Sequence, residues 1–177
     1  MDTLSNLVRV AVDLCRLRRG PQDVPHSPNL FGALIVASVV LDLLVGHLLG
    51  DGADVLPRSL LSTAIVLALC WIALAIRRLR NRYVQTATAL LACGVLLSLL
   101  QVPLAWLAGP PPADANALGG LQIALGWLAL AVFVWQLAVD AHIMRHAIES
   151  SWGLAFALVV SWVLAYWALE RLLFGAV

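Results

Sequence analysis

The chain has 177 residues, of which 62% are hydrophobic and 12% are charged, and its mean hydropathy is +0.94. This composition excludes nucleic-acid readers, Rossmann-type enzymes and secreted disulfide scaffolds, because a chain of this length has no room for a soluble domain beside its apolar segments. A membrane-spanning helix needs about 20 mostly apolar residues. We therefore expect an all-α, polytopic bundle of transmembrane helices. All eleven basic residues are Arg, and the formal net charge is +1.

Residues 1–19 are expected to form an amphipathic helix that lies in the membrane interface and does not cross the bilayer. Apolar side chains recur here at intervals of three and four, and charged side chains occupy the rest of the helical wheel. The apolar set is Leu4, Leu7, Val8, Ala11, Leu14 and Cys15. Arg9 and Asp13 interrupt the apolar core that a secretory signal requires, so we expect this helix to be retained, with its Arg side chains toward lipid phosphates. Residues 20–29 follow as a proline-rich hinge.

Five apolar segments, separated by clusters of glycine, proline and arginine, form a transmembrane domain over residues 30–177. Each is long enough to cross the hydrocarbon core. The expected spans are residues 30–49, 59–76, 83–107, 121–144 and 152–174. Pro103 falls close to the far end of the third span, where a kink is tolerated.

The distribution of Arg predicts the orientation, because basic loops stay on the cytoplasmic side of the membrane. Only Arg58 and Arg171 fall on the second side of the expected bundle. The first side carries Arg9, Arg16, Arg18, Arg19, Arg77, Arg78, Arg80, Arg82 and Arg145. We therefore expect a multi-pass protein with a cytoplasmic N-terminus and a C-terminus on the opposite side of the membrane.

Two Arg clusters have a second interpretation besides topology. They are Arg16, Arg18 and Arg19, and Arg77, Arg78, Arg80 and Arg82. Clustered Arg next to a span is also typical of binding to anionic lipid headgroups or to an acidic partner. The topological interpretation explains both clusters without further assumptions, and both interpretations stay open.

Stripes of small and polar residues predict the faces on which the helices pack, since helices in lipid associate through small side chains and a few polar contacts. On the fifth span the stripe is Gly153, Ala157, Ser161 and Ala165. On the fourth it is Gln122, Gly126, Ala129, Phe133, Gln136 and Asp140. The third span carries Ala87, Leu91, Gly94, Ser98 and Gln101, and the first carries Ser38, Asp42 and Gly46. These stripes predict a compact bundle.

Asp42 is the main candidate for function, because a carboxylate inside a span costs roughly 2.5 to 3.5 kcal/mol on the insertion scale. Gln101 is expected at a similar depth, within reach of a hydrogen bond, and no basic residue accompanies Asp42 in the core. Gln136 and Asp140 are further polar residues within the spans. Asp42 is interpreted either as an ion or proton site or as a hydrogen-bonded structural contact between helices.

Metal binding and catalysis are not expected. His142, His146 and Glu149 are spaced to share one helix face, which can hold zinc if His26 or a water completes the site. Polar residues are ordinary at a helix end, however, and a His-Glu-x-x-His motif is absent. The chain also has no Gly-x-Ser-x-Gly motif and no Lys for a phosphate-binding loop. We expect no metal, no cofactor and no enzymatic activity, and we interpret Cys15, Cys70 and Cys93 as packing residues.

The architecture resembles the bacterial branch of the Yip-type family of small five-span membrane proteins. The resemblance is carried by the amphipathic start, by the Arg-Arg-Gly-Pro-Gln-Asp-Val-Pro segment at 18–25, by the five closely spaced spans and by the His-Ile-Met-Arg-His-Ala link at 142–147. Eukaryotic members interact with Rab-type GTPases in membrane trafficking. Their Asp-Leu-Tyr-Gly-Pro motif is absent here, so no GTPase-binding residue is implied. The resemblance to the bacterial branch implies a bacterial inner-membrane protein, whose outward-facing C-terminus is then periplasmic.

The sequence leaves two functional hypotheses. The first is a non-enzymatic scaffold or accessory subunit, whose partners are membrane lipids and either a second membrane protein or another copy of the chain, with no nucleic acid. The alternative is a small oligomeric transporter or channel with a polar path through Asp42, Gln101 and Gln136. The two hypotheses differ in the role of Asp42. A transporter requires its carboxylate for proton- or cation-coupled flux, whereas a scaffold requires only its hydrogen bond.

Overall fold

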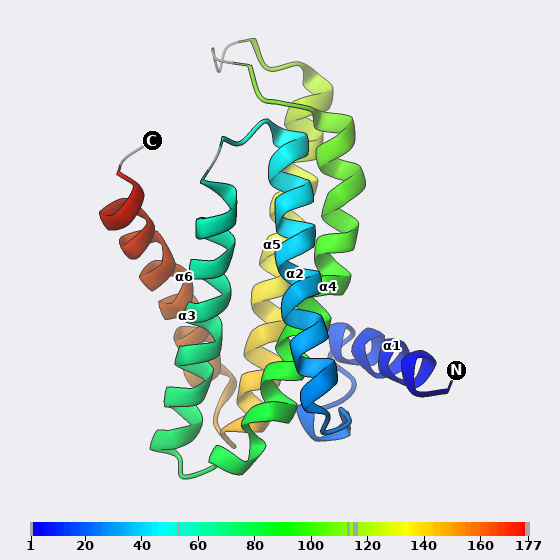
Figure 1. Ribbon diagram of the computed structural model, residues 1–177, viewed down its shortest axis with the longest axis vertical. Coiled ribbons are helices and arrows are strands. Elements are labelled where there is room, and N and C mark those ends of the chain that lie inside the picture. The colour runs from blue at the N-terminus through cyan, green and yellow to red at the C-terminus, as the bar shows by residue number, and fades with distance from the viewer. Residues whose placement is uncertain (1, 53, 113, 115–116, 176–177) are drawn as a thin grey trace.

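The computed structural model describes residues 2–52, 54–112, 114 and 117–175, and this part of the chain contains helices and no strand (Figure 1). The elements are α1 (Asp2–Cys15), η1 (Pro21–Asp23), α2 (Pro28–Leu49), α3 (Val55–Ile76), η2 (Arg80–Arg82), α4 (Tyr83–Ala108), α5 (Gly120–Ala147) and α6 (Trp152–Phe174). Helices α2 to α6 are each long and apolar enough to cross a membrane. The protein is a multi-pass, all-α transmembrane bundle, as the sequence predicted.

The spans lie close to their predicted positions, and the differences have local causes. α6 has the predicted bounds, and α4 ends one residue later than predicted. α3 begins at Val55, four residues before the predicted start, since Pro57 is compatible with the first turn of a helix. The predicted loop residue Arg58 therefore lies on a helix, and this placement matters for the site.

The two ends of the bundle terminate their helices differently. At one end, which we call the glycine end, Gly50, Gly109 and Gly175 follow α2, α4 and α6 with positive φ angles of 76°, 61° and 77°. Glycine reaches such angles at no steric cost. The opposite end carries the connections α1–α2, α3–α4 and α5–α6, and we call it the arginine-rich end.

At the arginine-rich end the left-handed positions are held by residues with side chains. Leu17, Arg78 and Glu149 have φ angles of 59°, 61° and 52°. After each, a backbone N–H returns to a carbonyl five residues earlier, as from Ser150 to Arg145 at 3.0 Å. This pattern satisfies the last helical carbonyls. A left-handed residue with a side chain costs about 1–2 kcal/mol, so these turns depend on the contacts around them.

The best-packed part of the protein lies toward the arginine-rich end. Fully buried side chains come from α1, α3, α4, α5 and α6, and examples are Leu14, Leu74, Cys93, Ile143 and Val159. On α4, every residue from Thr86 to Cys93 is buried. Toward its C-terminus α6 runs away from α5 (Figure 1), so packing is looser at the glycine end.

The sequence analysis expected the apolar face of α1 to meet lipid at the membrane interface, and in the structure this face packs on protein. Leu7, Val10, Ala11 and Leu14 are buried among residues of α4 and α5, and Val8, a member of the predicted face, is 46% exposed. Figure 1 shows α1 crossing the bundle at a steep angle to the spans. The side chain of Leu4 lies outside the described part of the chain.

The contacts of α1 place it well inside the ends of the spans. Cys93 donates from Sγ to the carbonyl of Ala11 at 3.8 Å, and Trp135 donates from Nε1 to the carbonyl of Cys15 at 3.0 Å. Cys93 lies ten residues into α4, which corresponds to about 15 Å of helix rise. The small residues Ala89, Ala92 and Cys93 of α4 allow this close approach.

Candidate functional site

A cavity of about 400 Å³ lies at the glycine end, where residues of α2, α3, α4 and α6 converge. We call it the vestibule. Its polar lining residues are Asp42, Asp51, Arg58, Ser59, Ser62, Ser98, Gln101, Tyr166 and Glu170. Polar side chains inside a bundle are expensive in lipid and are characteristic of ligand or ion paths. The vestibule is therefore a chemically distinct region of an otherwise apolar bundle.

Asp42 and Gln101 both line the vestibule, as their predicted depths suggested, but the predicted hydrogen bond between them is absent. Instead, Ser59 donates from its hydroxyl to the Asp42 carboxylate at 2.7 Å. The reason is the α2–α3 hairpin, in which Asp42 and Ser59 each lie within about two turns of the connecting loop. Asp42 lies seven residues before the end of α2 and Ser59 lies four residues after the start of α3, so the sequence signal for Ser59 is only its place in the loop-proximal half of the hairpin.

The close approach of α2 and α3 also depends on Gly46, which lies one turn after Asp42. A Cβ on Gly46 would lie only 2.6 Å from Cγ1 of Val55, so a larger residue would force the two helices apart. The small stripe predicted on the first span therefore faces the interior at this point. Its function is to bring Asp42 next to α3.

The vestibule also contains an ion pair that the sequence analysis missed. Arg58 Nε lies 3.6 Å from Glu170 Oε1, and the Arg58 guanidinium lies 5.7 Å from the ring centroid of Phe174. The Arg58 Nε atom is buried and has no hydrogen-bond partner among the described residues. The expectation that no basic residue accompanies Asp42 is wrong, because the early start of α3 carries Arg58 into the same cavity.

A second cavity, of about 300 Å³, lies between α3, α5 and α6, and we call it the midspan cavity. Gln136 and Asp140 line it, and Gln136 donates from Nε2 to Asp140 Oδ1 at 2.9 Å. Trp162 is 3% exposed, and its buried Nε1 has no hydrogen-bond partner within the described chain. The cavity thus combines one carboxyl group with an unsatisfied donor.

The two cavities share the lining residues Ser62 and Tyr166. Asp42 lies seven residues before the end of α2, and Asp140 lies seven residues before the end of α5. Each carboxyl group is therefore about 10 Å from its end of the bundle, Asp42 from the glycine end and Asp140 from the arginine-rich end. The two cavities therefore lie on either side of Ser62 and Tyr166, and we call the two cavities together with these two residues the polar path.

At the arginine-rich end two Arg side chains hold the helix connections together. Arg82 lies 2.7 Å from Glu149 and donates to the carbonyl of Ala147 at 3.4 Å. Arg77 donates to the carbonyls of Ile148 and Glu149 at 3.1 and 3.3 Å. Cations here satisfy the free carbonyls at the end of α5. We call Arg77, Arg82 and Glu149 the arginine latch.

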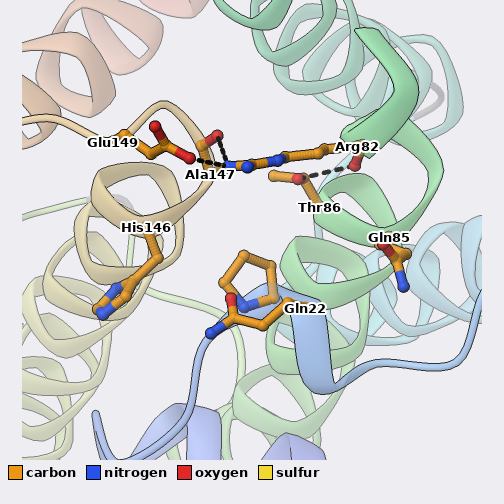
Figure 2. A pocket seen from close by; sticks show the side chains of 8 residues that line it. Gln22, Arg82, Gln85, Thr86, His146, Ala147 and Glu149 are labelled. Atoms are coloured by element: carbon orange, nitrogen blue, oxygen red, sulfur yellow. Dashed lines mark hydrogen bonds and ion pairs between the residues drawn. The ribbon is translucent and has the colours of Figure 1, made fainter. Parts of the chain in front are cut away.

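Figure 2 shows Arg82, the last residue of η2, extending toward Glu149 along one side of a cavity of about 310 Å³, with Gln22 on the other side. Arg77 and Arg82 of the predicted lipid-binding clusters thus contact the protein itself. Two further members do the same: Arg80 lies 5.3 Å from the ring centroid of Trp71, and Arg19 pairs with Asp13 at 3.0 Å. Arg16, Arg18 and Arg78 are exposed.

His142, His146 and Glu149 do not share a helix face, because α5 ends at Ala147 and Glu149 turns back to Arg82. The His142 ring donates from Nε2 to the carbonyl of Arg19 at 2.9 Å, and His146 donates from Nδ1 to the carbonyl of His142 at 2.9 Å. Within the described ranges, His26 included, no three His, Cys, Asp or Glu residues gather into a group that could hold a metal.

The predicted small-residue stripes divide into two groups. Ala87 and Leu91 on α4 are buried, and Gln136 and Asp140 on α5 line the midspan cavity. The stripe on α6 faces the other way. Gly153, Ala157 and Ser161 are exposed and Ala165 is half-buried, whereas α6 packs inward through Ala155, Val159 and Trp162.

Comparisons with family models, with curated proteins and with solved structures found no match to this chain. The resemblance to the Yip-type family stays a prediction based on architecture. The functional argument therefore depends on the geometry of the polar path alone.

Proposed function

We propose that the protein transports protons or small cations across the membrane along the polar path. The observation that supports this proposal is the pair of neighbouring cavities that share the lining residues Ser62 and Tyr166, with Asp42 in one and Asp140 in the other. Ionisable residues inside a membrane are characteristic of proton relays and ion paths. A purely structural role for Asp42 would not require a cavity around it.

The lining of the vestibule favours positive charge. It contains three acidic residues, Asp42, Asp51 and Glu170, against the single basic residue Arg58. Arg58 lies beside Glu170, which leaves Asp42 and Asp51 as the excess acid. A cation entering at the glycine end meets oxygen ligands from carboxylates, hydroxyls and the Gln101 amide, and these are the ligands that hard cations prefer.

In this proposal the arginine latch keeps the opposite end shut. The positive-inside rule predicts that the arginine-rich end is cytoplasmic, and in this orientation the vestibule opens to the outside. Passage inward requires the packing between the midspan cavity and the latch to rearrange. Asp140, the last carboxyl group on the path, is the expected acceptor of the proton or cation at that step.

The test uses purified protein in sealed liposomes containing a pH-sensitive dye, with an imposed pH gradient and potential. We expect flux above that of protein-free liposomes for the wild type. We expect Asp42→Asn, which keeps the size of the side chain and removes its charge, to lower the flux at least tenfold. Asp54→Asn is the matched control, because Asp54 is an exposed acid at the same end that does not line the vestibule.

Retained flux in Asp42→Asn would contradict the proposed role of Asp42 and favour its interpretation as a structural contact. The second candidate function, a scaffold or accessory subunit, is favoured by the exposed stripe Gly153, Ala157 and Ser161 on α6, since small residues allow helices to approach closely. No flux in the wild type, together with a reproducible second membrane protein in the solubilised particle, would support the scaffold instead.

A further inference from the structure

A basic pocket lies at the arginine-rich end, outside the proposed transport path. Its volume is about 540 Å³, and it is formed by the α1–α2 connection, the last turns of α5 and the start of α6. Its charged and imidazole lining residues are Arg18, Arg19, Asp23, His142, Arg145 and His146. It shares none of its lining residues with the vestibule or the midspan cavity.

The positive charge of this pocket is only partly neutralised by the protein. Arg19 pairs with Asp13 at 3.0 Å, and the Asp23 carboxylate accepts from the backbone N–H of Gly20 at 3.4 Å. The guanidinium groups of Arg18 and Arg145 have no acceptor within the described part of the chain. Two free guanidinium groups at one cavity match the oxygens of a phosphate group, which arginine binds with two parallel hydrogen bonds.

The histidines fix the shape of the pocket. His142 donates to the carbonyl of Arg19 and so holds the segment that carries Arg18 against α5. His146 donates from Nδ1 to the carbonyl of His142, and the two rings lie 4.4 Å apart. With Nδ1 donating, Nε2 of the neutral His146 ring is an acceptor, and it can accept from a hydroxyl of a ligand. The backbone next to Arg18 is thus held by the fold before any ligand arrives.

An apolar surface continues from the pocket along the spans. Leu128, Trp135 and His142 are spaced seven residues apart and follow one face of α5, on which Leu128 and Trp135 are 51% and 46% exposed. On the other side of the pocket, Trp152 at the start of α6 stacks on Phe156 with a centroid distance of 5.3 Å. An exposed Trp at this level is typical of the boundary between headgroups and acyl chains.

We infer that this pocket binds the phosphate-bearing headgroup of an anionic phospholipid, whose acyl chains lie along the exposed apolar face of α5. A free phosphate would meet the same Arg side chains but would leave that face unused. The proposal does not depend on transport. It assigns lipid binding to Arg18 and Arg145, whereas the Arg77 and Arg82 side chains of the predicted cluster bind the protein's own carbonyls.

The test measures lipid retention and thermal stability of the purified full-length protein in detergent. We expect native mass spectrometry to detect one retained phosphatidylglycerol, and we expect added phosphatidylglycerol, but not phosphatidylcholine, to raise the Tm. The double variant Arg18→Gln and Arg145→Gln should bind phosphatidylglycerol at least tenfold more weakly. Arg78→Gln should bind it normally, because Arg78 is exposed at the same end and does not line the pocket.

Arg145→Gln alone is the second variant, and an intermediate loss of binding is expected from it even if the double variant does not fold. A second set of measurements tests whether inorganic phosphate or glycerol phosphate raises the Tm of the wild type. Stabilisation by either one equal to that by phosphatidylglycerol would overturn the lipid assignment in favour of a free anion. Equal phosphatidylglycerol binding by the folded variants and the wild type would overturn the site itself.

Discussion

The two halves of the bundle contrast in packing although the same five spans run through both. Toward the arginine-rich end, residues such as Leu74, Ile143 and Met144 are fully buried. Toward the glycine end, α2, α3, α4 and α6 surround the vestibule, and Leu99, Leu100 and Trp106 of α4 are exposed. A close-packed half is stiff because its side chains interdigitate, whereas a cavity can change shape.

The contrast follows from where small and polar residues lie along each helix. On α4, Thr86, Thr88 and the alanines between Thr86 and Cys93 let α1, α2 and α5 approach closely, and both hydroxyls donate to backbone carbonyls four residues earlier. Ser98 and Gln101, five and eight residues after Cys93, line the vestibule. The order of residues along α4 therefore accounts for a close-packed half next to a half that contains the vestibule.

The largest effect is expected from a cavity in the packed half. Ile143→Ala should lower the free energy of unfolding by about 2–5 kcal/mol, since it removes a fully buried side chain. Ile123→Ala on the same helix removes a side chain that is 47% exposed, and it should change stability by no more than about 0.5 kcal/mol. Unfolding in mixed micelles of a mild detergent and dodecyl sulfate measures both variants. Similar losses in the two variants would mean that the halves do not differ in packing.

A smaller effect is expected at the arginine latch. Arg82→Gln removes the pairing with Glu149 and the bond to the carbonyl of Ala147. The Arg82 and Glu149 side chains are 39% and 62% exposed, so solvent screens the pair and the expected loss is about 1 kcal/mol. A double-mutant cycle with Glu149→Gln measures the coupling between the two residues. Arg16→Gln, at an exposed Arg of the same end, is the control, and an equal loss there would remove the special role of the latch.

Much of the fold was predictable, because a span is specified by local composition. The helix bounds followed from the length of each apolar segment and from the Gly, Pro and Arg residues between segments, and both ends of α6 were predicted correctly. The docking of α1 was not predictable from its own pattern, since an amphipathic face that packs on lipid and one that packs on α4 have the same periodicity.

The candidate site was predicted only in part. Asp42, Gln101, Gln136 and Asp140 were selected because polar residues inside spans are rare, and each lines a cavity. Arg58 was missed because a basic residue next to Pro57 was assigned to a loop, and its partner Glu170 was missed with it. Which stripe faces the interior also could not be predicted, because the exposed face of α6 and the buried face of α4 carry the same kinds of small residue.

The most direct test of the contrast between the two ends is thiol accessibility at the junction of the two cavities. In a variant without Cys15, Cys70 and Cys93, Ser62→Cys is treated with a charged, membrane-impermeant maleimide from either side of sealed membranes. Asp54→Cys and Arg78→Cys, made separately, report which side is the glycine end and which is the arginine-rich end. Ala89→Cys, at a fully buried position, is the unlabelled control.

The account predicts that Ser62→Cys is labelled only from the side that labels Asp54→Cys. Labelling of Ser62→Cys from the side that labels Arg78→Cys would contradict a vestibule that opens at the glycine end and is closed at the arginine-rich end. No labelling from either side, with both reporters fully labelled, would equally contradict it.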